Sequence, residues 1–139
     1  MAAVIPTDGM LFLAELLRRG LPLKGVVHLF TGPLIPNSNT RIVDFTEASF
    51  NGYVPQPIIA WQPAFLLPNG SALLSSDPVS WISLAISSTP PVTGYWIEQT
   101  DWALVNRLVS VERFGTGIPF FRVGVSLTIY LPLAVNSLF

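Results

Sequence analysis

The segment at residues 122–133 constrains the fold most, because apolar side chains recur there at every second position. The apolar set is Val123, Val125, Leu127, Ile129, Leu131 and Leu133, and residues of the opposite set are Arg122, Gly124, Ser126, Thr128 and Tyr130. A period of two places successive side chains on opposite faces of a strand. Such alternation is typical of antiparallel sheets with one solvated face, whereas strands of parallel sheets are continuously apolar. The segment therefore predicts a half-buried antiparallel strand.

Five further segments have the composition of strands, and turn residues separate them. The segments are residues 24–31, 58–67, 79–87, 94–98 and 104–112, with Pro or Gly turns at 32–33, 68–70, 77–78, 90–91 and 115–117. Short strands separated by frequent turns, without an alternation of strands and helices, are typical of sandwiches and barrels. We therefore expect a mainly β chain that forms an antiparallel β-sandwich or jelly-roll-like domain with one N-terminal helix.

Residues 9–19 form the one predicted helix, which Asp8 can cap and Gly20 can end. Spacings of three and four residues give its main apolar stripe as Met10, Leu13, Ala14 and Leu17. Three apolar residues lie off this stripe, so the helix packs either in its own core or against a neighbouring subunit. We predict an oligomer or capsid interface at these three, Leu11, Phe12 and Leu16. Residues 1–139 then form one domain, with an N-terminal arm and helix at 1–22 and a β-sandwich at 23–139.

Charged residues are scarce in this chain, at 11% against 50% hydrophobic residues. A soluble domain of this size leaves much of its chain exposed and carries about a quarter charged residues. The imbalance predicts apolar surface that is covered by other protein. The net charge of −1 and the absence of a basic cluster argue against nucleic acid as a partner. No segment approaches the roughly 18–20 uninterrupted apolar residues of a spanning helix, so we expect no membrane partner either.

The residues that could carry chemistry are few. His28 is the only histidine and there is no cysteine, so a zinc site would need carboxylates for all its remaining ligands. We predict a packed or interface histidine, with no catalytic residue, no metal and no cofactor. Glu98 and Asp101 are the nearest acidic pair, and an alternative reading makes them the two carboxylates of a glycoside hydrolase.

Four tryptophans offer flat apolar faces that can pack in a core, anchor an interface or stack on sugars. Trp81 lies in an apolar strand segment and is predicted to be core. Trp102 lies beside Asp101 in a predicted turn and is the best candidate for an exposed ring. It is therefore the predicted contact residue if the chain binds glycan.

One stretch carries a family resemblance. It begins with the run HLFT at residues 28–31, continues through a loop rich in Pro and Asn, and ends with DFTEASFNGY at residues 44–53. The run GYW at 94–96 and the run ERF at 112–114 follow in order. Together these motifs resemble a family of small structural proteins of tailed bacteriophages. From the residues themselves, one or two helical turns are expected within 44–50, capped by Asp44 or Thr46.

The resemblance implies a virion structural protein without catalytic residues, either a capsid decoration (cement) protein or a part of the tail. The implied partners are further copies of the chain, as a trimer or other homo-oligomer, and the major capsid protein or other virion proteins. The implied location is the virion, assembled in the host cytoplasm. The alternative function is a tail, baseplate or fibre module that binds host surface glycan through Trp102.

Overall fold

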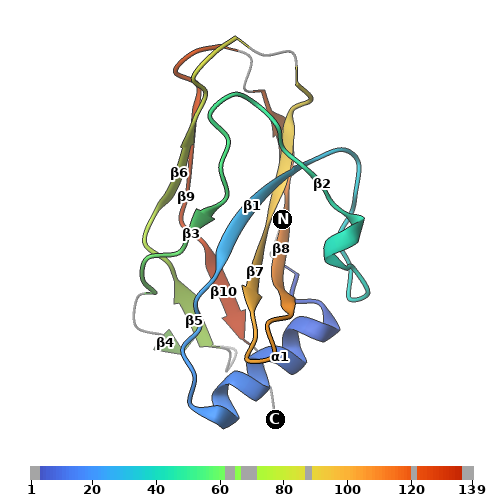
Figure 1. Ribbon diagram of the computed structural model, residues 1–139, viewed down its shortest axis with the longest axis vertical. Coiled ribbons are helices and arrows are strands. Elements are labelled where there is room, and N and C mark those ends of the chain that lie inside the picture. Colours follow the sequence, from blue (N-terminus) through green and yellow to red (C-terminus); the bar gives the residue numbers. More distant parts are fainter. Residues whose placement is uncertain (1–3, 62–64, 67–71, 87–88, 120–121, 136–139) are drawn as a thin grey trace.

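The computed structural model describes residues 4–61, 65–66, 72–86, 89–119 and 122–135 (Figure 1). The chain is mainly antiparallel β with one N-terminal helix, in a β-sandwich-like arrangement, as predicted. In chain order the elements are α1 (Thr7–Arg19), β1 (Val26–Thr31), the 3₁₀ turn η1 (Ile42–Asp44), β2 (Thr46–Glu47), β3 (Gln56–Pro57), β4 (Phe65–Leu66), β5 (Ala72–Ser75), β6 (Val79–Ile82), β7 (Val92–Thr100), β8 (Asn106–Ile118), β9 (Ser126–Ile129) and β10 (Pro132–Val135). Within these ranges, no helix has the length and apolar composition to cross a membrane.

The largest sheet has the order β2-β1-β7-β8, and β3 pairs with the same edge of β1 as β2 does. A second sheet has the order β10-β5-β4, and β6 pairs with β9 in a two-stranded ribbon. All of these pairings are antiparallel. In Figure 1, β6 and β9 lie side by side to the left of the large sheet, with β5 and β10 below them.

Both faces of the large sheet carry apolar clusters. Val27 and Leu29 of β1 point into the main core, which also receives Tyr95 and Trp81. The next residue, Phe30, points to the opposite face, where a second cluster contains Phe30, Trp96, Leu108 and Val111 and is covered by Val4, Ile42 and Phe45. The segment that carries η1 therefore lies over this second face, and it brings polar residues of β2 close to β1.

Helix α1 packs against β8 through a different stripe from the predicted one. Its buried residues are Gly9, Phe12, Leu13 and Leu16, whereas Leu17 is exposed. The close approach depends on Gly9, because a Cβ at this position would lie 2.5 Å from the carbonyl oxygen of Val109. Pro6 rather than Asp8 is the N-cap residue, and Gly20 ends the helix in the left-handed conformation as predicted.

This arrangement corrects the predicted interface. Phe12 and Leu16 are 5% and 4% exposed and lie in the core of their own chain, where they are not available to another subunit. Leu11 is 66% exposed and stays a candidate contact residue. Both stripes have the spacing of a helix face. A search for apolar side chains at this spacing does not count glycine. The correct stripe begins at a glycine that has no side chain to bury.

The alternating segment at the C-terminal end is divided between two sheets. β9 pairs with β6, and β10 pairs with β5. From Val125 to Leu131 the alternation is confirmed, with odd-numbered residues turned inward and even-numbered residues exposed. Val123 is exposed, contrary to the prediction, and the side chain of Leu133 lies outside the described residues. The chain changes sheets just before Pro132, whose missing N–H weakens continued pairing.

Two other predicted elements differ from the structure. Strands β1, β6, β7 and β8 confirm four predicted segments with shifted ends. In the predicted strand at 58–67, only Phe65–Leu66 is a strand among the residues described. The helical turns expected within 44–50 are wrong, because η1 ends at Asp44 and Thr46–Glu47 is extended and pairs with β1. The backbone bonds available along the edge of β1 override the local capping pattern.

Candidate functional site

His28 lies on β1 at the surface of the second face, where its side chain is 12% exposed. Its neighbour across the sheet is Trp96 of β7, and the two rings stack with centroids 4.6 Å apart and planes inclined by 9°. Phe45 stacks on the same tryptophan at 4.5 Å and 7°. A stack of three rings therefore holds the imidazole in one orientation.

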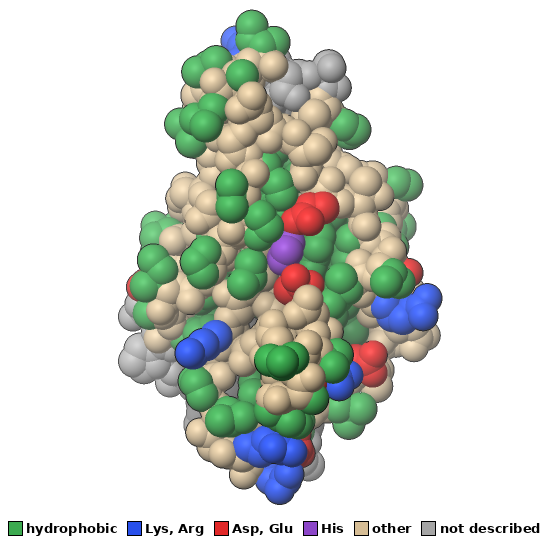
Figure 2. Space-filling view, viewed as in Figure 1, with side chains coloured by type: hydrophobic (Ala, Val, Ile, Leu, Met, Phe, Trp, Pro, Cys, Tyr) green, Lys and Arg blue, Asp and Glu red, His purple; other side chains and the backbone are tan. Residues whose placement is uncertain are grey.

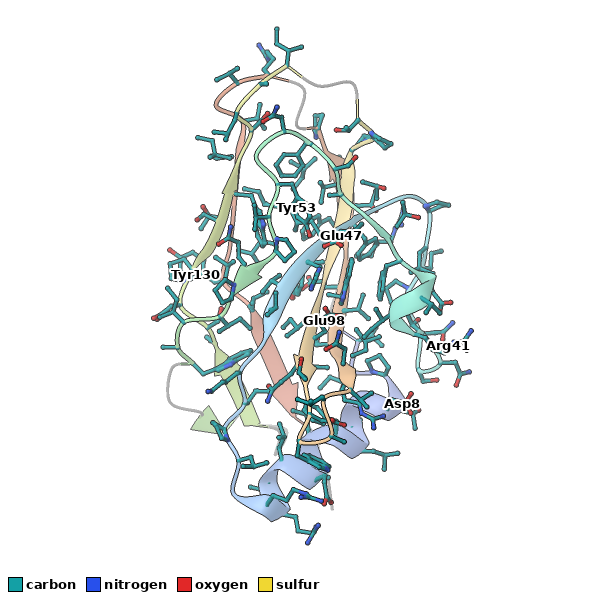
Figure 3. All side chains as sticks on the ribbon, viewed as in Figure 1. Asp8, Arg41, Glu47, Tyr53, Glu98 and Tyr130 are labelled. Atoms are coloured by element: carbon teal, nitrogen blue, oxygen red, sulfur yellow. The ribbon has the colours of Figure 1, made fainter. Side chains whose placement is uncertain are left out.

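Two carboxylates flank the imidazole. Glu47 of β2 places Oε2 2.5 Å from Nδ1, and Glu98 of β7 places Oε1 2.8 Å from Nε2. The second contact is an ion pair. Figure 2 shows the histidine at the surface between two acidic side chains, and Figure 3 shows where Glu47 and Glu98 lie, with Glu47 above Glu98 in that view. We call these three residues the His28 cluster.

The carboxylates set the protonation state of the ring. Burial alone would lower the pKa of His28, but the hydrogen bonds to Glu98 and Glu47 outweigh burial and raise that pKa. The hydrogen bond from His28 lowers the pKa of Glu98 against the opposing effect of burial. The stacked indole adds a further preference for the cationic ring. The two carboxylates therefore favour the imidazolium form of His28.

Tyr53 joins the cluster to the edge of the sheet. Its hydroxyl donates to Oε2 of Glu47 at 2.6 Å and accepts the backbone N–H of Leu29 at 3.1 Å. β2 and β3 pair with opposite ends of β1, and Leu29 lies in the gap between them. The hydroxyl thus satisfies a backbone donor that the sheet leaves without a strand partner. Burial, and then the hydrogen bond to Glu47, raise the pKa of Tyr53, so the hydroxyl stays protonated.

This geometry suits a structural role. Both nitrogens of His28 face carboxylates of the same chain. The carboxylates lie on opposite sides of the ring and do not converge on one point. In the described ranges no group of His, Asp and Glu side chains has the geometry to hold a metal ion. The cluster ties the segment after η1 to β1 and β7.

The acidic pair predicted from the sequence is not brought together as a pair. Glu98 contacts His28, whereas Asp101 is buried in the turn between β7 and β8. Asp101 accepts the backbone N–H groups of Ala103 and Val105 at 2.8 and 2.9 Å, and Nε of Arg107 donates to it at 2.8 Å. The hydrogen bond from Val105, followed by that from Arg107, lowers the pKa of Asp101. This carboxylate shapes the turn that carries Trp102.

Trp102 is 43% exposed, and Trp81 is core, both as predicted. The guanidinium of Arg19 lies over the Trp102 ring, 3.9 Å from its centroid, and the ring of Phe12 lies 6.1 Å away. Two shallow depressions of about 210 and 310 Å³ flank the indole. The smaller is lined by Asp8, Leu11, Phe12, Glu15, Asp101, Trp102 and Arg107. One face of the ring is therefore already occupied by a cation of the same chain.

Sequence reasoning missed Glu47 and Tyr53 as partners of His28. Both lie in the run at 44–53 that carries the family resemblance, but the expected helical turns would have directed Glu47 elsewhere. The extended pairing of Glu47 with Phe30 places its side chain beside His28. If residues 46–47 had been predicted as a strand paired with residues 30–31, the alternation of side chains would have placed Glu47 on the same face as His28.

Many large apolar side chains lie at the exposed surface. Fifteen large apolar side chains are exposed in the described part of the chain. They are Leu11, Leu17, Leu21, Ile35, Val43, Val54, Ile59, Ile82, Leu84, Ile86, Trp102, Leu104, Val105, Val123 and Tyr130. Figure 2 shows hydrophobic side chains gathered over the upper lobe as well as scattered below it. Ile82 and Leu84 belong to β6 and its continuation, on the outer face of the ribbon.

Comparison with known proteins adds no family to this geometry. No protein-family model, no curated protein and no solved structure matches the chain. Function is therefore argued from the chain's own surface and contacts.

Proposed function

We propose that the chain is a structural protein of a tailed-bacteriophage particle, in particular a capsid decoration protein that acts through protein–protein contacts without catalysis. One observation carries the proposal. Among the residues that the structure describes, fifteen large apolar side chains are exposed, in a chain with only seven basic and eight acidic residues. Exposed apolar surface of this extent, with few charges to keep molecules apart, is typical of surfaces that bind other protein.

The mechanism is burial of apolar surface at joints between subunits. Each square ångström of apolar surface removed from water contributes about 25 cal/mol. Contacts of ordinary size, about 800 Å² on each partner, repeat around a closed shell and together resist its expansion. The large sheet supports this role because both of its faces carry apolar clusters and the His28 cluster ties its edge segment in place. A rigid body of this kind binds without a large cost of ordering.

The contact residues follow from exposure. Leu11 on α1 and the pair Ile82 and Leu84 on the ribbon expose 66%, 50% and 62% of their surface. The partners are further copies of the chain and the major capsid protein. The site of action is the assembled virion.

Binding to capsids tests the proposal. Capsids of the phage that encodes the chain, prepared without it, are mixed with the purified protein and sedimented. We expect the protein to sediment with the capsids and to raise their melting temperature. The double variant Ile82→Ser and Leu84→Ser should weaken binding at least tenfold, whereas Val43→Ser, an exposed apolar residue on η1, serves as the matched control. Wild-type protein that stays in the supernatant at every concentration would refute the decoration role.

The second candidate function is glycan binding by a tail module through Trp102. The two depressions beside this half-exposed indole favour it, because a sugar ring needs a flat apolar face with room around it. The guanidinium of Arg19 covers part of that face. On a glycan array, Arg19→Ala should then strengthen binding and Trp102→Ala should abolish it. An array without signal for the wild type and for Arg19→Ala would dismiss this function.

A further inference from the structure

Among the described residues, β9 is an edge strand whose outer hydrogen-bonding groups have no strand partner. In the ladder with β6, Ile82 lies opposite Ser126, and the N–H of Ser83 donates to the carbonyl of Val125 at 2.8 Å. Bonded and non-bonded pairs alternate along an antiparallel ladder. The N–H and C=O groups of Ser126 and Thr128 therefore point away from β6.

On β6, too, the backbone groups of alternate residues point away from the partner strand. The N–H of Leu84, two residues beyond Ile82, points away from β9 and donates to the carbonyl of Asn51 at 3.0 Å. That edge of β6 is covered by the chain around Asn51. Across the described ranges, the backbone groups of Ser126 and Thr128 make no such bond to another segment.

The open edge lacks the usual guards against pairing with another strand. Natural edge strands are protected by charged side chains, by proline or by bulges. From Ser126 to Leu131 the chain has neither a charge nor a proline, and the residues are polar hydroxyl or apolar types that favour strands. A two-stranded ribbon is also marginal by itself and gains stability from added strands.

We propose that β9 is a strand-addition site for a second copy of this chain, which pairs its own β9 antiparallel about a twofold axis. Two ribbons then form one four-stranded sheet. This inference rests on the proposed self-association and assigns it to one strand. Its chemistry is the exchange of backbone hydrogen bonds between two extended segments.

The strand is complementary to itself in one register. With Thr128 on the twofold axis, its outward N–H donates to the carbonyl of Thr128 in the second copy, and its carbonyl accepts the N–H of that residue. Ser126 then lies opposite Tyr130 of the second copy, and Leu127 lies opposite Ile129. On the outer face the cross-strand pairs are hydroxyl with hydroxyl, and on the inner face apolar with apolar. An isologous contact requires this kind of self-matching.

Charge favours a second copy over a charged peptide. The outer face of the ribbon presents only uncharged side chains, namely Ser80, Ile82, Ser126, Thr128 and Tyr130. Two copies can approach without repulsion between like charges, and a charged peptide finds no opposite charge to bind. The exposed Ile82 and Tyr130 then lie on a continuous sheet surface that spans both copies.

Substitutions of Thr128 by charged residues test the inference. Because Thr128 is exposed and faces itself across the axis, Thr128→Lys and Thr128→Glu each place like charges opposite one another. Sedimentation equilibrium should show a dimer dissociation constant at least tenfold higher for each variant alone. An equimolar mixture of the two should form the dimer again. Ser80→Lys is the matched control, because it adds the same charge to the same face one strand further from the axis.

The results separate this inference from the proposed function. Loss of the dimer in both single variants and recovery in the mixture would support the inference. Wild-type protein that is monomeric, or variants that dimerise as the wild type does, would overturn it, and capsid binding would then decide the decoration role alone. Recovery of the dimer together with no capsid binding would leave strand addition standing and refute decoration.

Discussion

His28 lies where three segments meet, and its charge decides whether they attract one another. The charged and titratable groups that face it are Glu47 from β2, Glu98 from β7 and the hydroxyl of Tyr53, which bonds to Glu47. An imidazolium attracts both carboxylates. A neutral ring leaves two negative groups on either side of it with no cation between them, so the segment after η1 loses part of its attachment.

We predict that the free energy of unfolding is greatest between about pH 4.5 and about pH 6.5, the ordinary pKa values of Glu and His. The raised pKa of His28 contributes stability that is fully present below the ordinary value and is lost as pH rises through the folded value. The lowered pKa of Glu98 contributes stability that is present above its ordinary value and is lost as pH falls through the folded value. Urea unfolding at pH values from below this range to above it measures both losses.

Two variants identify the origin of the pH dependence. His28→Gln cannot be charged, so the decline of stability above about pH 6.5 should flatten. Tyr53→Phe keeps the His28 ion pairs but removes the hydrogen bond to Glu47 and leaves the N–H of Leu29 without its acceptor, and should cost about 1–3 kcal/mol. Above about pH 6.5 that cost should not vary with pH, because the tyrosine stays protonated. An unchanged alkaline decline in His28→Gln would show that the cluster is not its source.

Part of the site was predictable at this scale. The single histidine, in a chain without cysteine, indicated a packed or interface residue, and its side chain is 12% exposed. The sequence pattern placed no acid beside it, whereas the structure places two there. The identity of its partners was not predictable. Trp96 and Glu98 come close only through the register of β1 with β7, and Glu47 only because its segment is extended. Register depends on pairings far apart in the chain, which local patterns do not determine.

At the scale of elements, the contact between α1 and β8 depends on Gly9. A Cβ at this position would meet the backbone oxygens of Val109 and Leu108 at 2.5 and 2.7 Å. Backbone cannot give way as a flexible side chain can. We predict that Gly9→Ala lowers the free energy of unfolding by about 1–3 kcal/mol, despite the better helix propensity of alanine. Chemical denaturation followed by circular dichroism measures the change.

Gly115→Ala is the matched control for this substitution. Gly115 lies in β8, and a Cβ there would meet nothing within 4 Å. Its stability should stay within about 0.5 kcal/mol of the wild type. If both variants were equally stable, the helix would not be held against the sheet in the way described.

The elements show which sequence patterns determine structure and which do not. Period-two alternation predicted the inward and outward residues from Val125 to Leu131, because it reflects burial directly. It did not show that the chain pairs with β6 before Pro132 and with β5 after it, because alternation does not identify the partner strand. The helical period admitted two stripes on α1, and only the tertiary contact at Gly9 separates them.

At the scale of the whole molecule, apolar surface and an open strand edge occur together. The ribbon formed by β6 and β9 exposes Ile82 and Tyr130 on an uncharged face. Other exposed apolar side chains, such as Leu11 on α1, lie on other elements. The composition, poor in charge and rich in apolar residues, predicted exposed apolar surface, and the structure shows which residues form it. Composition could not show where they lie, because the residues of the ribbon come from two distant segments of the chain.

The native mass of the purified protein, measured by light scattering over a wide range of concentrations, tests the central claim most directly. The claim is that this surface exists to be covered by protein. We predict a closed homo-oligomer whose mass is an integral multiple of 15.2 kDa and stays constant above a threshold concentration. A monomer at every concentration that also fails to bind capsids would contradict the account.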